Sequence, residues 1–228
     1  MATNSDLATT ILTISALTVS RNGNRLLDNV SATVARGSIT LLMGHNGAGK
    51  TVLMNCLHGL MAYDSGKIDA PPRTQQKMVF QKPVLLRRSA RQHLKFLCPL
   101  LADAKIEALL ARADLNHRAN TPARALSGGE QQKLALIGAL ATHPDILFLD
   151  EPTAHLDFEA TKSIESMIRE AHDGGTSILM TSHNRAQAER LAQHVLLLDK
   201  GMLVESAPAP QFFSAPSHPL ARHYLDHV

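Results

Sequence analysis

A glycine-rich stretch at residues 44–51 has the residue types and spacing of a phosphate-binding loop, GHNGAGKT. Glycines at its first, fourth and sixth positions permit positive φ angles, so that successive N–H groups can point into one anion-binding hollow. The Lys50 side chain can reach the β- and γ-phosphates of a nucleotide, and the Thr51 hydroxyl can ligate Mg²⁺. This motif is a Walker A loop, and the residues expected to contact the phosphates are Gly44, His45, Asn46, Gly47, Ala48, Gly49, Lys50 and Thr51.

The segments on either side of this loop are the ones that such a loop requires. Residues 39–43 form a short apolar run without charge, which is typical of a buried parallel strand, and an apolar helical pattern follows the loop to about Leu60. Polar residues also follow three other predicted strands: Gln81 after 77–80, Asp150 and Glu151 after 146–149, and His183 after 177–181.

A second glycine-containing motif, LSGGEQQ, occupies residues 126–132 and precedes an Ala- and Leu-rich helix predicted from Gln131 to Thr142. Ser127, Gly128 and Gly129 offer a hydroxyl and backbone N–H groups at the start of that helix, where an anion is favoured. An alternative is that Ser127 and Glu130 form a capping box, and we expect both roles. Because the first loop already supplies a complete phosphate cradle, the second donor set is expected to serve a partner's nucleotide.

Composition limits the class of protein. The chain has 228 residues, of which 44% are hydrophobic and 19% charged, and its formal net charge of +3 is too small to indicate a nucleic-acid partner. There is no apolar run of membrane-spanning length. Residues 1–6 are polar, are expected to be a frayed tail and lack a secretion signal. The two cysteines, Cys56 and Cys98, are expected to be buried thiols rather than a disulfide.

The pattern along the chain predicts an α/β core with a helical insertion. Other predicted strands are 11–19 and 30–34, joined by a turn at 21–24, an edge strand from 67 to 69, and a hairpin of 195–199 and 202–205 around Lys200-Gly201. Predicted helices span 90–101, 103–113, 158–173 with Asp157 as its cap, 185–193, and a short segment from about Leu220.

The order of these motifs resembles that of the nucleotide-binding subunit of an ATP-binding cassette (ABC) transporter, from about Leu17 to Phe213. The LSGGE motif is specific to that family. The resemblance implies one domain over residues 1–228: a phosphate-loop NTPase (RecA-like) core with an antiparallel β subdomain, about 7–82 and 144–228, and an inserted helical subdomain, about 83–143. It further implies that two copies form a head-to-tail homodimer, in which each LSGGE motif caps the γ-phosphate held by the other copy's Walker A loop.

The resemblance also implies roles for individual residues. Asp150 would hold Mg²⁺, and Glu151 would be the general base that polarises the attacking water. An alternative for Glu151 is a simple pairing with a nearby cation. Gln81 would contact Mg²⁺ or the water at the hinge to the helical subdomain, and His183 would contact the γ-phosphate. The other histidines show no ligand spacing, so no metal other than Mg²⁺ is expected.

Two positions depart from the family pattern. Asp157 matches the family's D-loop, but His155 stands where a smaller residue is usual. Family members often have an aromatic residue near Arg21 that stacks on adenine, and residues 19–23 contain none. Arg21 could stack through its guanidinium plane instead, which leaves open a choice between ATP and GTP.

The resemblance implies a peripheral protein at the cytoplasmic face of the cell membrane, bound to a permease subunit and through it to a solute-binding protein. Apolar residues from Phe80 to Leu86, rimmed by Arg87 and Arg88, are expected to line the permease groove, with burial in the helical subdomain as the alternative. The run at residues 80–89, with 203–205 and 212–213, is similar to importers of tungstate-type oxyanions. The alternatives are a soluble ABC ATPase of translation or DNA repair, and a nucleotide-gated interaction module.

Overall fold

The computed structural model describes residues 10–227, so the predicted tail at residues 1–6 lies outside the described part of the chain. The strands are β1 (Thr10–Arg21), β2 (Asn24–Ala35), β3 (Ile39–Met43), β4 (Ser65–Asp69), β5 (Gln76–Val79), β6 (Ile146–Leu149), β7 (Ser177–Thr181), β8 (His194–Asp199) and β9 (Met202–Pro208). The α-helices are α2 (Lys50–His58), α3 (Ala90–Leu97), α4 (Asp103–Arg112), α5 (Gly128–Leu140), α6 (Phe158–Asp173), α7 (Arg185–Leu191), α8 (Ala209–Ser214) and α9 (Pro219–Leu225).

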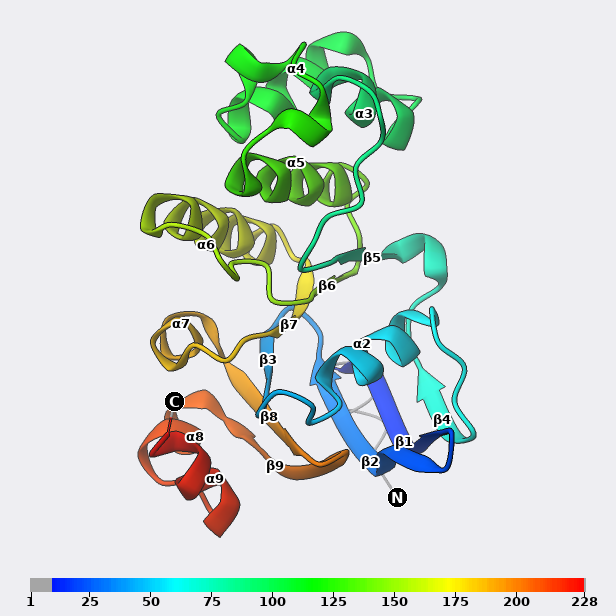
Figure 1. The fold of residues 1–228 in the computed structure, drawn as a ribbon, viewed down its shortest axis with the longest axis vertical. Coiled ribbons are helices and arrows are strands. Elements are labelled where there is room, and N and C mark those ends of the chain that lie inside the picture. Colours follow the sequence, from blue (N-terminus) through cyan, green and yellow to red (C-terminus); the bar gives the residue numbers. More distant parts are fainter. Residues whose placement is uncertain (1–9, 228) are drawn as a thin grey trace.

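Two sheets organise the chain (Figure 1). An antiparallel sheet has the order β2-β1-β4, and a larger sheet has the order β5-β6-β7-β3-β8-β9, in which β5 to β8 run parallel and β9 is antiparallel. The chain between β5 and β6 carries α3, α4 and α5, which lie together at one end of the molecule. The structure therefore confirms the α/β phosphate-loop fold with an antiparallel sheet and a helical insertion.

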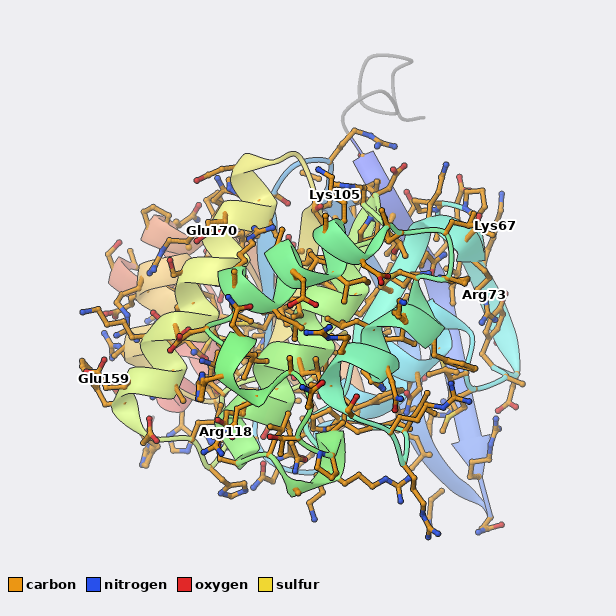
Figure 2. All side chains as sticks on the ribbon, turned by 90° about the horizontal axis from the view of Figure 1, so that it is seen from above. Lys67, Arg73, Lys105, Arg118, Glu159 and Glu170 are labelled. Carbon is orange, nitrogen blue, oxygen red and sulfur yellow. The ribbon has the colours of Figure 1, made fainter. Side chains whose placement is uncertain are left out.

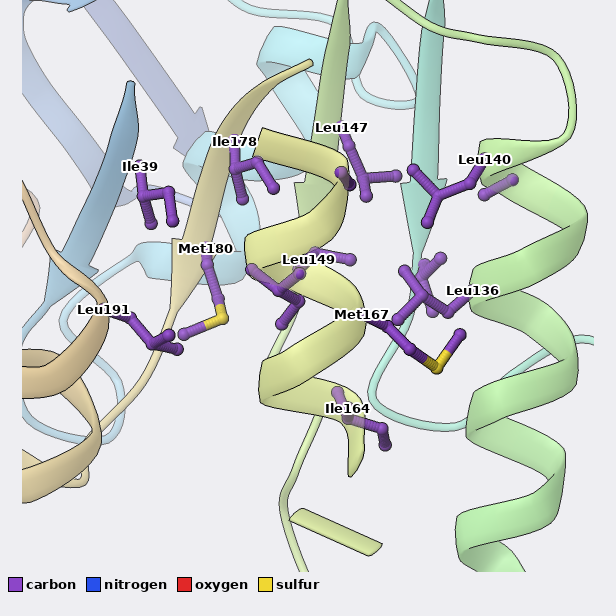
Figure 3. Packing of buried hydrophobic residues seen from close by; sticks show 14 of the residues in the cluster. Ile39, Leu136, Leu140, Leu147, Leu149, Ile164, Met167, Ile178, Met180 and Leu191 are labelled. Atoms are coloured by element: carbon purple, nitrogen blue, oxygen red, sulfur yellow. The ribbon is translucent and has the colours of Figure 1, made fainter. Parts of the chain in front are cut away.

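Alternating side chains of the central strands separate the apolar core into two clusters. In β6, Ile146 and Phe148 pack with the antiparallel sheet and α2, whereas Leu147 and Leu149 pack with α5 and α6. Successive residues of a strand point to opposite faces, so each strand supplies both clusters. Figure 3 shows the second cluster, in which Met167 of α6 lies beside Leu136 of α5.

Three of the strands and one of the helices near the site begin and end where the sequence predicts. β3, β6, β7 and α6 have the expected bounds, and Asp157 caps α6 by accepting a 2.7 Å hydrogen bond from the Ala160 N–H.

Cys56 and Cys98 are buried free thiols, as expected. Viewed onto α3–α5, charged side chains such as Arg118, Glu159 and Glu170 lie around the surface (Figure 2).

Several predicted bounds were wrong for identifiable reasons. β1 and β2 extend up to a two-residue turn, because Asn22 and Gly23 both have positive φ, as a tight hairpin requires. Helix α5 begins at Gly128 rather than Gln131, since Ser127 caps it, and α3 ends at Leu97 rather than Leu101. Helix α8 was missed because of its proline, although a proline in the first turn of a helix disturbs no hydrogen bond.

Candidate active site

The predicted site residues follow four neighbouring parallel strands. The phosphate-binding loop follows β3, Gln81 lies two residues after β5, Asp150 and Glu151 follow β6, and His183 lies two residues after β7. In the register of the sheet, Val79 pairs with Leu149, Leu149 with Met180, and Leu42 with Thr181. The strands therefore end at the same edge, and segments far apart in the sequence converge there.

The backbone of the phosphate-binding loop needs its glycines. Gly44, Gly47 and Gly49 have φ angles of 143°, 81° and 104°. A Cβ on Gly44 would lie 2.1 Å from the Leu198 carbonyl oxygen, so no other residue fits there without moving β8. Gly49 precedes α2, and no side chain caps this helix, which leaves its first N–H groups free for an anion.

Lys50 is buried, and its ammonium group lies inside the loop. The Nζ atom donates to the carbonyl oxygens of Gly44 at 2.7 Å and His45 at 3.1 Å. Burial lowers the pKa of Lys50, while the charges of Glu151 and Asp150 act in the opposite direction. Lys50 is therefore a hydrogen-bond donor inside the site, with Asp150 and Glu151 nearby.

Gln81 and His183, predicted to contact Mg²⁺ or the water and the γ-phosphate, both contact Glu151, the predicted general base. Gln81 Nε2 donates to Glu151 Oε2 at 3.3 Å, and His183 Nδ1 lies 3.4 Å from Glu151 Oε1. Glu151 has a φ of 45°, an uncommon conformation for a residue other than glycine that turns the chain sharply after β6. The carboxylate is therefore held between two side chains from adjacent strand ends.

Thr181, a residue that the sequence analysis missed, connects the two acidic residues. Its hydroxyl donates to Asp150 Oδ1 at 2.7 Å and accepts the N–H of Glu151 at 2.8 Å. The signal in the sequence was its place at the end of a strand that was predicted to lie in the core. Since Thr181 is fully buried, it holds both acidic residues against the edge of the sheet.

A cavity of about 660 Å³ opens above this edge. It is lined by Leu26, Asn46, Gly47, Gly49, Lys50, Thr51, Val52, Gln81, Glu151, His155 and His183. Among residues 10–227, no group of three or more His, Cys, Asp or Glu side chains could hold a metal. Mg²⁺ needs few protein ligands when water and phosphate complete its shell, and the oxygen atoms of Thr51, Gln81 and nearby Asp150 are of the kind it prefers.

Arg21, which could have stacked on the nucleotide base, does not line this cavity. Its guanidinium group donates to Asp64 Oδ1 at 3.2 Å and to the carbonyl oxygens of Ser20 and Ala62. Arg21 therefore ties the loop after α2 to the end of β1. Leu26 lines the cavity on the side of the antiparallel sheet.

The LSGGE segment lines a different cavity. Ser127 and Glu130 form the expected capping box, in which Glu130 Oε2 accepts the Ser127 N–H at 2.8 Å and Ser127 Oγ accepts the Glu130 N–H at 3.3 Å. The hydrogen bond from the Ser127 backbone lowers the pKa of Glu130. Ser127, Gly128, Gly129 and Asp157 line a cavity of about 480 Å³ that shares His155, but not Lys50, with the first.

A third cavity, of about 280 Å³, lies between the helical insertion and β5. We call it the insertion groove, and it is lined by Lys77, Met78, Val79, Phe80, Pro83, Val84, His93, Leu97, Ala135, Gly138, Ala139 and Thr142. Val84 is 75% exposed at its rim. Leu85, which was expected to line the groove, is instead 4% exposed and packs in the core. The described residues contain no helix long and apolar enough to cross a bilayer.

Comparison with known proteins gives matches across nearly the whole chain. Residues 27–154 match the family model described as ABC transporter. The arginine transport ATP-binding protein ArtM of Bacillus subtilis is 28% identical over 96% of this chain and 100% of its own length. A phosphate import ATP-binding protein of Vibrio cholerae, PstB 1, is 30% identical over 95% of this chain and 89% of its own length.

A solved structure has the same fold. It is cbiO1 from Clostridium perfringens, described as part of the ABC transporter complex cbiONQ. It superimposes with a TM-score of 0.80 and 25% identity, and the match covers 91% of this chain and 92% of that one.

Proposed function

Since this chain belongs to the ABC transporter family and is an ATP-binding ATPase subunit of that family, we propose that two copies form a head-to-tail homodimer that drives a membrane permease. The observation that carries this proposal is the separation of two half-sites. Lys50 and Glu151 line one cavity, and Ser127 lines another. One copy can complete the nucleotide site of the other only if the two pack face to face with two-fold symmetry.

The phosphate-binding loop holds the nucleotide through its N–H groups, and the Lys50 ammonium group stabilises the β- and γ-phosphates. Thr51, Asp150 and Gln81 would hold Mg²⁺, which neutralises phosphate charge when it is bound. Lys50 must then exchange its bonds to the Gly44 and His45 carbonyl oxygens for bonds to phosphate. This exchange replaces neutral acceptors with charged ones, which make stronger hydrogen bonds.

Glu151 accepts a proton from the attacking water and orients it towards the γ-phosphorus atom. Gln81 and His183 hold its two carboxylate oxygens, and His183 donates to the γ-phosphate once the site closes. In the dimer, the hydroxyl of Ser127 and the N–H groups of Gly128 and Gly129 contact the γ-phosphate held by the other copy, and Asp157 lies at the interface beside them.

The partner is a permease subunit that docks in the insertion groove, with this protein at the cytoplasmic face of the membrane. We propose import of a small solute, such as tungstate or another oxyanion, delivered to the permease by a solute-binding protein. The similarity to a phosphate import protein supports an oxyanion. The formal net charge of +3 is too small to indicate a nucleic-acid partner. The permease and the solute-binding protein would select the solute.

The groove gives a direct test of the partner. We expect Val84→Glu to abolish co-purification with a polytopic membrane subunit that the wild type retains, because it places a charge in an apolar interface. The ATPase activity of the isolated chain should stay within about twofold. Met202→Glu, on the exposed face of β9, is the matched control and should co-purify normally. Normal co-purification of Val84→Glu would exclude the groove as the docking site.

The position of Arg21 leads to a prediction about which nucleotide base the site accepts. Because Arg21 is bonded to Asp64 and the cavity lining contains no Phe, Tyr or Trp, base stacking of about 1–3 kcal/mol is not expected. We expect kcat/KM for ATP and GTP to agree within about tenfold. Steady-state phosphate release with each nucleotide measures the ratio. A preference for ATP of about a hundredfold or more, lost in Arg21→Ala, would instead assign adenine stacking to Arg21.

A further inference from the structure

Helix α9 reaches the phosphate-binding loop through one buried tyrosine. Tyr224 is 3% exposed, and its hydroxyl oxygen accepts the N–H of Gly44, the first residue of the loop, at 3.3 Å. The edge of its ring meets the next loop residue, His45, with 4.9 Å between ring centroids and 72° between ring planes. The contact joins residues that are 180 positions apart in the sequence.

The same helix is fixed to the segment that carries His183. Arg185, the first residue of α7, donates through Nη1 to the Leu225 carbonyl oxygen at 3.1 Å. The buried carboxylate of Glu205, in β9, accepts the N–H groups of the two residues that precede α9, Ser217 at 2.8 Å and His218 at 2.9 Å. Helix α9 is therefore a fixed support between the loop after β3 and the loop after β7.

Gly44, the first residue of the phosphate-binding loop, is held through both its N–H and its carbonyl group. Lys50 donates to the carbonyl oxygens of Gly44 and His45, and Tyr224 accepts the Gly44 N–H. When Lys50 turns to phosphate, its two bonds to the loop are lost. The Tyr224 contact involves a different atom, the Gly44 nitrogen, so it does not compete with the exchange of the Lys50 bonds.

We propose that Tyr224 is a positioning residue for nucleotide binding, which fixes the start of the phosphate-binding loop against α9 and, through Arg185, against the His183 loop. The proposal depends on the proposed function in one respect: the nucleotide must bind in the cavity that Lys50 lines. It adds α9, which lies outside the Walker A and LSGGE motifs, to the elements that support the nucleotide site. Neither Tyr224 nor Arg185 lines that cavity, so both act through the backbone.

Tyr224→Phe removes the acceptor and keeps the ring. The Gly44 N–H, which is buried, then has no partner, and we expect KM and the dissociation constant for Mg-ATP to rise about three- to tenfold with kcat within twofold. The matched control is Tyr63→Phe, which makes the same change at the other tyrosine of the chain, 40% exposed, and should leave both constants unchanged.

Hydrogen–deuterium exchange of a peptide covering residues 39–49 gives a readout that general destabilisation would not reproduce. In nucleotide-free Tyr224→Phe this peptide should exchange faster, while peptides from α5 and α6 exchange as in the wild type. Unchanged affinity and exchange in a folded Tyr224→Phe variant would overturn the proposal. Failure of the wild type and Tyr63→Phe to bind Mg-ATP would instead overturn the proposed function.

Discussion

Glu151→Gln is expected to bind Mg-ATP with near wild-type affinity and to hydrolyse it roughly 10²–10⁴ times more slowly. The amide preserves the shape of the side chain and can still contact Gln81 and His183, but it cannot accept a proton from water. Because binding is retained while turnover is blocked, the variant should accumulate as an ATP-bound dimer. Phosphate release and size-exclusion chromatography with and without Mg-ATP measure the two effects.

A matched control for this substitution is Glu170→Gln on the outer surface of α6. Glu170 accepts from Arg112 at 3.0 Å and is 51% exposed, and such a surface pair contributes little to stability. Its turnover should equal that of the wild type. If Glu151→Gln hydrolysed ATP at a near-normal rate, Glu151 would not be the base and its pairing with His183 would be structural.

A dimer that carries two substitutions in different copies is expected to hydrolyse ATP. A dimer that carries the same two substitutions in one copy is expected to be inactive. Lys50→Ala removes the phosphate donor of one half-site and Ser127→Arg blocks the other, and we expect each alone to lower hydrolysis by roughly 10²-fold or more. A dimer with Lys50→Ala in one copy and Ser127→Arg in the other retains one intact composite site. We expect about half of the wild-type rate from it.

The control is a dimer of the wild type with the double variant Lys50→Ala, Ser127→Arg, in which both composite sites carry one substitution. It should be inactive. Differently tagged copies, co-expressed and purified through both tags, give each mixed dimer free of parent dimers. The reverse order of activities would mean that each copy completes its own site, and equal activities would also contradict the head-to-tail arrangement.

The central part of this fold could be predicted because its strands are short apolar runs bounded by polar residues. β3, β6 and β7 contain no charge and are followed directly by residues that cannot continue a buried strand, such as Asp150 after Leu149. The residue types after these strands then indicated the phosphate chemistry. The predicted contacts of Gln81 and His183 with nucleotide and water, like the contact of Ser127 with a second copy, stay predictions.

The contacts that hold these residues in place could not be read from local pattern. Thr181 and Tyr224 act on Asp150 and Gly44 across long stretches of chain, and neither has a spacing that sets it apart from an ordinary core residue. The family resemblance suggests base stacking for Arg21, but its hydrogen-bond partners Ala62 and Asp64 come from the loop after α2. Such pairings depend on tertiary packing, which the periodicity of a single segment does not reveal.

The place where the helical insertion leaves the large sheet has a mechanical consequence. The chain enters and leaves the helical insertion α3–α5 at β5 and β6, which are the edge strand of that sheet and its neighbour (Figure 1). Gln132 of α5 donates to the Phe80 carbonyl oxygen at 3.3 Å. A force carried along the chain from the insertion would therefore enter the large sheet at this rim, through β5 and β6 and not through β7 or β3. Gln81, two residues after β5, is the site residue beside that junction.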